Sequence, residues 1–289
     1  MNGIINVLKP PGMTSNDVIV SIRRMLGEKK AGHAGTLDPG AAGVLPVCTG
    51  RATRLFDYLV DKEKEYIAEI TFGVETDSQD QYGAITVKRD GIPDHGALCE
   101  AVAAQTGSIL QKPPMYSAIK HQGRKLYDLA REGADIEVKE RRVDIHAIDI
   151  LKQNAPKSWL LKIRCSRGTY IRTICHDIGQ RLKCGAHLSM LIRTACGPFA
   201  IQHSYTLEQI KETYETKAIQ DILLPMDFSL QDYSRIDLGA EEFRALRNGR
   251  SIHTDAGDEF NRLYYNADLI GIGQTLAGEC RIKTFLMQV

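Results

Sequence analysis

The chain has 289 residues, of which 43% are hydrophobic and 25% are charged. This composition is ordinary for a globular protein, and it excludes disorder over most of the chain. Lys and Arg total 37 against 36 Asp and Glu, so the overall charge gives no sign of a nucleic-acid or membrane partner. The length predicts about two domains, and no apolar stretch approaches the ~20 residues needed to span a bilayer.

Cysteine usage points to a reducing compartment. The seven cysteines are an odd number at irregular spacing and form no CxxC pair, so we expect free thiols in a cytoplasmic protein. Residues 1–9 contain one short apolar run and no basic leader, which is typical of a strand and not of a signal peptide. Only Cys184 and His187 have a spacing typical of metal ligands, and we expect no metal.

The first half of the chain mixes strands and helices. Apolar spacing predicts strands over residues 3–8 and 66–72 and helices over 15–26, 51–60 and 94–105. Between the first two helices lies a glycine-rich loop, residues 32–43. Ser15 is the predicted N-cap of the first helix, and Gly27 is predicted to end it.

The second half begins with a proline-rich loop over 111–125 and ends in short strands. The patterns predict strands over 143–150, 159–165 and 188–192 and a helix over 171–182. A further helix begins at a capping box formed by Thr206 and Gln209. After Pro225 the patterns predict a helix over 241–247 and strands over 268–272 and 281–287. No regular βαβ rhythm is present, which favours an α+β fold. We predict a main domain over 1–230 and a small β-rich module over 231–289.

Positive charge is concentrated between Lys162 and Arg193. This segment holds seven basic residues and one acid, Asp177, so its charge is +6. A polyanion would meet the protein here. The alternative is a basic surface balanced by acids elsewhere in the molecule.

The segment from Gly32 to Gly43 is the first candidate for chemistry. Its four glycines let the backbone approach a ligand closely, and Asp38 is its only acid. A lone carboxylate among small residues suits a nucleophile or a general base. The alternative is a tight turn in which Asp38 bonds its own backbone. The segment lacks the spacing of a dinucleotide-binding loop, and the chain contains no Walker A or HExxH pattern.

A second candidate lies where a predicted strand ends and a predicted helix begins, between Cys165 and Arg172. A helix N-terminus with Arg167 and Arg172 nearby suits a phosphate or a carboxylate. The alternative for Arg172 is a solvated side chain on an amphipathic helix. Tyr66 by itself is typical of a strand core, and Tyr116 is typical of a loop anchor.

These segments, taken together, resemble one family. Gly32–Pro39 resembles the catalytic motif of the bacterial tRNA pseudouridine-55 synthases, the TruB family. Four more blocks match it in the family's order, at residues 9–16, 64–66, 113–120 and 165–173, the last followed by 184–188. Each block alone is modest, but five in order between residue 2 and about 200 are highly specific.

The resemblance implies an isomerase that converts uridine-55 in the T-arm of tRNA to pseudouridine, without cofactor or metal. It implies a mixed-sheet pseudouridine synthase domain, and the size and position of the tail suggest a PUA-like RNA-binding module. Asp38 matches the essential aspartate, acting as nucleophile or as base, and Arg172 matches its arginine partner. Tyr66, Tyr170 and Leu191 match three residues of the pocket. His33 matches the residue that enters the RNA stack when the uridine flips out.

Two departures from the family pattern stand out. The residue after the Asp-Pro pair is usually larger than Gly40, and the C-terminal module is short. We expect a monomer that binds tRNA without a guide RNA. The alternatives are an RNA-binding or tRNA-folding protein, and a related synthase with another uridine target or with a guide RNA.

Overall fold

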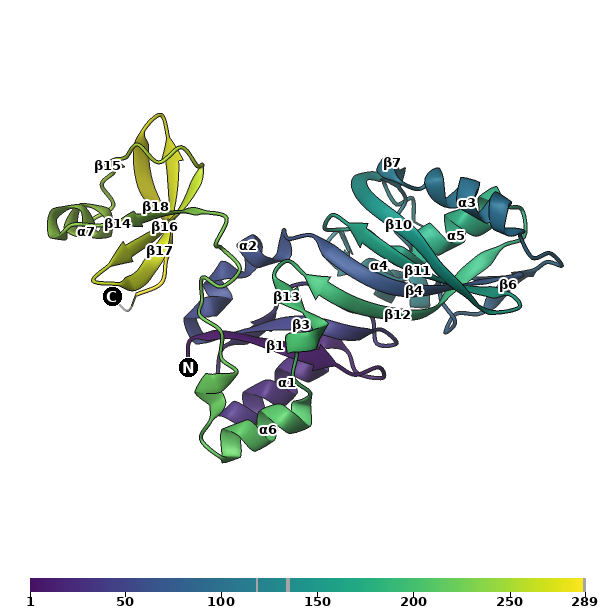
Figure 1. Ribbon diagram of the computed structural model, residues 1–289, viewed down its shortest axis with the longest axis horizontal. Helices are drawn as coiled ribbons and strands as arrows, with labels where there is room; N and C mark the ends of the chain where they lie inside the picture. The colour runs from purple at the N-terminus through teal and green to yellow at the C-terminus, as the bar shows by residue number, and fades with distance from the viewer. Residues whose placement is uncertain (118, 134–135, 288–289) are drawn as a thin grey trace. The chain divides into compact units, whose positions relative to one another are not determined.

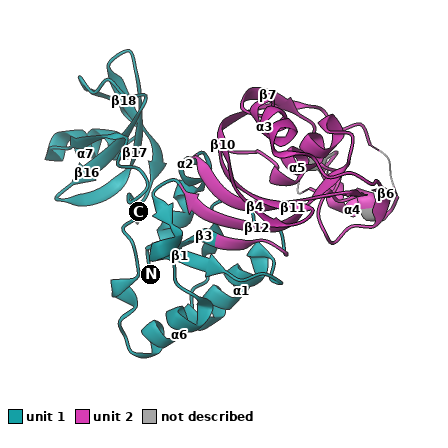
Figure 2. Cartoon of the chain, turned by 45° about the vertical axis from the view of Figure 1, so that its right-hand side comes forward, with its two compact units in different colours: residues 1–39, 44–61, 197–289 teal, residues 40–43, 62–196 magenta. Residues whose placement is uncertain are grey.

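Two units make up the chain in the computed structural model, which describes residues 1–117, 119–133 and 136–287. Unit 1 comprises residues 1–39, 44–61 and 197–289, and unit 2 comprises residues 40–43 and 62–196 (Figure 2). Both units are therefore discontinuous in sequence. The division into domains at residue 230 remains a prediction.

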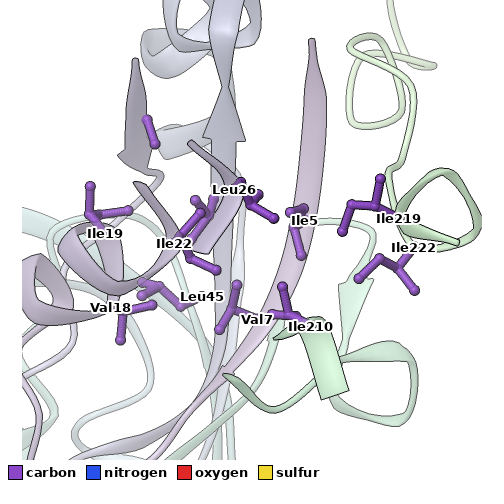
Figure 3. Packing of buried hydrophobic residues seen from close by; sticks show 12 residues of the cluster. Ile5, Val7, Val18, Ile19, Ile22, Leu26, Leu45, Ile210, Ile219 and Ile222 are labelled. Carbon is purple, nitrogen blue, oxygen red and sulfur yellow. The ribbon is translucent and has the colours of Figure 1, made fainter. Parts of the chain in front are cut away.

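The core of unit 1 is built by β1 (Gly3–Lys9), α1 (Ser15–Leu26) and α6 (Leu207–Glu215). Apolar positions at helical spacing place one face of α1 against alternate residues of β1. Figure 3 shows the resulting cluster, which includes Ile5, Val7, Val18, Ile22, Ile210 and Ile219. As predicted, α1 stops at Gly27, whose φ of 63° is the left-handed conformation that glycine adopts easily.

The glycine-rich loop of the sequence connects two strands. β2 (Ala31–His33) runs antiparallel to β3 (Ala42–Thr49), with Ala31 opposite Thr49. The predicted helix over 51–60 is present in two parts, a 3-10 turn η1 (Gly50–Leu55) followed by α2 (Phe56–Val60). Residues 34–39 thus lie between anchored strands, which limits the positions that the loop can take.

Unit 2 is built around one sheet with the strand order β12-β4-β11-β10-β7 (Figure 1). All of these neighbours are antiparallel, and the bounds are β4 (Lys64–Phe72), β7 (Gly107–Gln111), β10 (Arg141–Ala155), β11 (Ser158–Cys165) and β12 (Ala186–Cys196). Ala42 and Gly43 lie parallel to Ile192 and Arg193 of β12, so the sheet is mixed. The predicted strands are confirmed, and several extend further than the prediction.

Helix α5 (Ile171–Arg181) packs against strands β12 and β4, and α3 (His95–Ala103) packs against α5. Gly179 of α5 allows this close approach, because a Cβ there would lie 2.6 Å from the Cβ of Ala186. Asp94 caps α3, so the predicted helix over 94–105 is shorter at both ends.

Short elements lie between the strands of unit 2. β5 (Val74–Thr76) pairs with β6 (Ile85–Lys88), and the turn over residues 77–84 joins them. The segment predicted as a loop over 111–125 also contains the two-residue strands β8 (Lys120–His121) and β9 (Arg124–Lys125), followed by α4 (Leu126–Arg131).

The tail forms a second sheet, with the order β14-β16-β17-β18-β15. Its elements are β14 (Ser234–Asp237), α7 (Ala240–Arg247), β15 (Ile252–His253), β16 (Phe260–Tyr265), β17 (Asp268–Leu276) and β18 (Glu279–Phe285). The β-rich tail and the mixed sheet confirm the α+β fold. None of the helices in the described part of the chain is both long and apolar enough to cross a membrane.

Candidate active site

Asp38 follows a residue that is fixed by α1. The hydroxyl of Ser15 donates to the carbonyl oxygen of Leu37 at 3.0 Å and accepts from the Leu37 amide at 2.9 Å. Ser15 was the predicted N-cap, and this prediction is wrong: Thr14 caps the helix and forms a capping box with Asp17. With the cap supplied by Thr14, the buried Ser15 hydroxyl is used to hold the Asp38 loop.

The residue after Asp38 is fixed as well. The carbonyl oxygen of Pro39 accepts from the amide of Gly12 at 2.8 Å and from the ammonium of Lys9 at 3.3 Å. Lys9 is 0% exposed and also donates to the carbonyl of Pro10 at 2.9 Å. A buried ammonium needs such acceptors. The block at residues 9–16 therefore has a structural task, which is to fix both flanks of the half-buried Asp38.

His33 lies just before this loop. It is half-buried at the end of β2, opposite Val47 of β3. The amide of the next residue, Ala34, donates to the carbonyl of Pro46 at 2.9 Å. The position of His33 is thus defined by strand pairing, and its entry into the RNA stack remains a prediction.

Tyr66 and Leu191 share one face of the sheet of unit 2. Tyr66 on β4 is opposite Arg193 on β12, and Ala68 is opposite Leu191. Residues two apart on a strand point to the same side, so these four side chains lie on one face. Tyr66 is 8% exposed and Leu191 is half-buried. The sheet therefore brings together two of the predicted pocket residues.

Burial determines the chemistry of Tyr66. Desolvation raises the pKa of its phenol to about 12, although Arg193, which hydrogen-bonds to it, acts in the opposite direction. The phenol is therefore neutral throughout the physiological range. Arg193 is 1% exposed. Strand β12 passes so close to Gly43 that a Cβ atom on residue 43 would lie 2.7 Å from the backbone nitrogen of Arg193.

Tyr170 is positioned through its backbone at the start of α5. The side chain of Gln111 accepts from the Tyr170 amide at 2.8 Å and donates to the Tyr170 carbonyl at 3.1 Å. Gln111 is 0% exposed and ends strand β7. A buried amide with both groups bonded is a rigid support. Gln111 is not among the residues predicted from the sequence.

Arg172 lies in the first turn of α5 and is 4% exposed. Its guanidinium donates to the carbonyl oxygens of Ser78 at 3.0 Å and of Tyr116 at 2.8 Å, and it pairs with a carboxylate oxygen of Asp80 at 3.6 Å. The interpretation as a solvated arginine is therefore wrong. The pairing of Arg172 with Asp38 remains a prediction.

Asp80 is a carboxylate that sequence reasoning missed. Its second oxygen, Oδ1, accepts from the hydroxyl of Ser78 at 2.7 Å and from the amide of Tyr82 at 2.9 Å. A further contact fixes this turn to α5, since the Thr173 hydroxyl donates to Gln79 at 2.8 Å. The dense run of polar residues directly after a strand was the available signal for a functional turn.

The basic segment is less exposed than its sequence suggests. Arg172 and Arg193 are buried, and Lys162 pairs with Glu65 at 2.9 Å. Arg164 and Arg167 are exposed. Only part of the +6 charge is therefore available to a polyanion.

The cysteines and His187 have local structural roles. His187 donates from Nδ1 to the carbonyl of Val74 at 3.0 Å. All seven cysteines are free, and six of them are buried. Burial raises the pKa of Cys48 to about 12 and that of Cys165 to about 11, as expected for inert thiols.

Solved structures define the class of fold. The chain superposes on a chain in the crystal structure of a Cbf5–Nop10–Gar1 complex with a TM-score of 0.78 and 25% identity, covering 99% of this chain and 85% of that chain. The fold is that of the pseudouridine synthases.

Family models define the protein more narrowly. The TruB family pseudouridylate synthase N-terminal domain matches residues 23–171, and the tRNA pseudouridylate synthase B C-terminal domain matches residues 172–231. The chain belongs to the TruB family.

Similar proteins cover almost the whole chain. A tRNA pseudouridine synthase B from Pelotomaculum thermopropionicum is 46% identical over 260 residues, which are 88% of this chain and 82% of that protein. Another, from Caldanaerobacter subterraneus subsp. tengcongensis, is 42% identical over 288 residues and 98% of each chain.

Proposed function

We propose that this chain isomerises uridine-55 in the T-arm of tRNA to pseudouridine, with Asp38 as the catalytic residue. The observation that carries the proposal is membership of the TruB family, with relatives named tRNA pseudouridine synthase B that match it along almost its full length. The reaction breaks the bond between N1 of uracil and C1′ of ribose and forms a bond from C5 to C1′. The proton on C5 leaves and N1 gains one, so no atom is added and nothing is oxidised.

Asp38 begins the reaction in this proposal. Its carboxylate either attacks C1′ or removes a proton from the sugar, and both routes detach the uracil. Support comes from the hydrogen bonds to Leu37 and Pro39, which fix the two flanks of Asp38. A fixed backbone pre-organises the carboxylate, which is what positioning contributes to catalysis.

The target base lies on the sheet face of Tyr66 and Leu191 in this proposal. A uridine stacked in the T-arm cannot be isomerised, so the base must flip out, and His33 fills the gap. Neutral Tyr66 offers a ring on which the uracil stacks while it turns over. Tyr170, held by Gln111, closes the pocket, and Arg172 orients Asp38.

The chain works alone in this proposal, as a cytoplasmic monomer that needs no guide RNA, and its β-rich tail adds RNA contacts. The free thiols support a reducing compartment. The test is to incubate the purified chain with unmodified tRNA transcript and to map pseudouridine by position, with a transcript carrying cytidine at position 55 as control. Pseudouridine at position 55 alone is expected. Binding without product would favour an RNA-folding protein, and product elsewhere a synthase with another target.

A further inference from the structure

Tyr82 is an exposed aromatic residue on the turn that carries Asp80. Its side chain is 69% exposed, more than any other large hydrophobic residue in the described parts of the chain. Its backbone is nevertheless fixed, because its amide donates to Asp80 at 2.9 Å and the other oxygen of Asp80 pairs with Arg172. The exposed ring is therefore attached to a fixed backbone, where it is accessible to a partner.

The ring of Tyr82 lies against Gly40. A Cβ on residue 40 would be 2.7 Å from Cζ and 2.8 Å from the hydroxyl oxygen of Tyr82, and closer still to Cε2. Gly40 is not in the left-handed region, so its backbone does not require glycine. Space requires it. Gly40 comes two positions after Asp38 in the chain.

We propose that Tyr82 is a substrate-binding residue that stacks on a base of the tRNA T-arm beside the uridine that is isomerised. Gly40 provides the space in which the ring lies. The inference rests on the proposed function. RNA loops are recognised largely by stacking of unpaired bases on aromatic side chains, and a ring packed along one edge keeps a face free for a base. Tyr66 is buried and takes the flipped base, whereas Tyr82 takes a neighbour that stays outside.

The test compares substitutions of Tyr82 in the full chain, measuring tRNA affinity, KM and kcat separately. Tyr82→Ala should raise Kd and KM by about 5- to 150-fold, the range for losing one stacked base, with kcat at saturation within a few-fold of wild type. Tyr82→Phe and Tyr82→Trp should keep the affinity. Tyr82→Leu preserves bulk but has no aromatic face, so it should behave like Tyr82→Ala. Wild-type affinity for Tyr82→Ala, or full rescue by Tyr82→Leu, would overturn the proposal.

A spectroscopic signal separates stacking from a merely structural role. The only native tryptophan, Trp159, is 4% exposed, so new quenching in Tyr82→Trp on addition of tRNA would report a base on the ring. Unchanged fluorescence would count against stacking. Tyr214→Ala is the matched control, because Tyr214 is 40% exposed on α6 and should have no effect.

Gly40 supplies an independent arm of the experiment. Gly40→Leu would displace the ring, so it should weaken affinity about as much as Tyr82→Ala, and the double variant should be no weaker than either single one. Additive losses would contradict the coupling of the two residues. If the proposed function is wrong, the wild-type chain will form no pseudouridine. If the wild-type chain is active and the Tyr82 variants bind tRNA as well as it does, only the inference about Tyr82 is refuted.

Discussion

Two short loops of this molecule, one with Asp38 and one with Asp77 and Asp80, are anchored by different kinds of group. The Asp38 loop is fixed through its backbone, by Ser15, Gly12 and Lys9 from another segment. In the turn at residues 77–84 the carboxylate of Asp80 is itself an anchor, bonded to Ser78 and Tyr82 and paired with Arg172. One loop is therefore anchored through backbone groups on both sides of Asp38, and the other is anchored through a carboxylate side chain, that of Asp80.

The largest effect is expected for Asp38→Asn. It should lower pseudouridine formation by at least about 10²–10⁴-fold, the range that a general base supplies, while tRNA affinity stays within a few-fold. Single-turnover assays and a binding titration measure the two quantities. Readily detectable turnover at high enzyme concentration would remove Asp38 from the chemistry.

Arg172→Lys tests the residue that we expect to act with both carboxylates. A lysine ammonium cannot reproduce the planar fork that binds the carbonyls of Ser78 and Tyr116 together with Asp80. Leaving buried acceptors unpaired costs about 1–3 kcal/mol, so we expect turnover to fall by about 5- to 150-fold with tRNA affinity retained. Near-wild-type turnover with weakened binding would place Arg172 among the phosphate contacts.

Asp80→Asn should have a smaller effect than Asp38→Asn. Asparagine keeps an oxygen for the Ser78 hydroxyl and the Tyr82 amide but loses the charge beside Arg172, so turnover should drop by about tenfold. Single-turnover rates of the two variants, measured side by side, decide the matter. If Asp80→Asn is as inactive as Asp38→Asn, the distinction between the two carboxylates is wrong.

A matched pair of serine variants tests the side chains that hold the two loops. Ser15→Ala removes both side-chain bonds to Leu37 and should lower kcat several-fold, at a cost in stability of about 1–3 kcal/mol. Ser78→Ala leaves Asp80 with the Tyr82 amide and Arg172, so its kcat should change less. Urea unfolding and kcat are the measurements, and equal loss of kcat in both variants would contradict the prediction.

The smallest expected effect concerns exposed arginines. Arg167 is exposed, so Arg167→Glu should weaken tRNA binding and flatten the plot of log K against log salt by about one unit. Arg244→Glu, in the tail, should flatten it less. An unchanged slope for Arg167→Glu would mean that this basic surface does not meet RNA.

Much of the fold follows from local pattern, and the misses have physical causes. Alternating apolar residues at Tyr66–Phe72 were enough to predict a strand, and helical spacing was enough to predict α1, because one face of each element is buried. Nearby residues could not show whether Thr14 or Ser15 caps α1, because the Ser15 hydroxyl bonds to Leu37, 22 positions further along the chain. The mixed sheet likewise depends on pairing between distant segments.

The sequence could single out candidate site residues only where a motif is specific. Asp38 lies in such a motif, whereas Asp80 sits in an ordinary polar turn whose importance appears when α5 brings Arg172 against it. Charge counting overstated the exposed basic surface, because nothing local reveals that Arg193 is 1% exposed on a central strand. The space above Gly40 is likewise set by Tyr82, which is distant in sequence.

The discontinuity of unit 1 has a consequence for synthesis of the chain. Strand β1 pairs with β3 on one edge, and on its other edge Ile4 exchanges backbone hydrogen bonds with Leu224, at 3.0 and 2.8 Å, so this second edge is completed only by a segment made more than two hundred residues later. Unit 2 lies within residues 40–196 and leaves the ribosome complete well before that. Because long loops slow the formation of distant contacts, we expect unit 2 to become protected first. Pulsed hydrogen exchange during refolding would show amides of β4 and β11 protected before those of β1, and the reverse order would contradict this expectation.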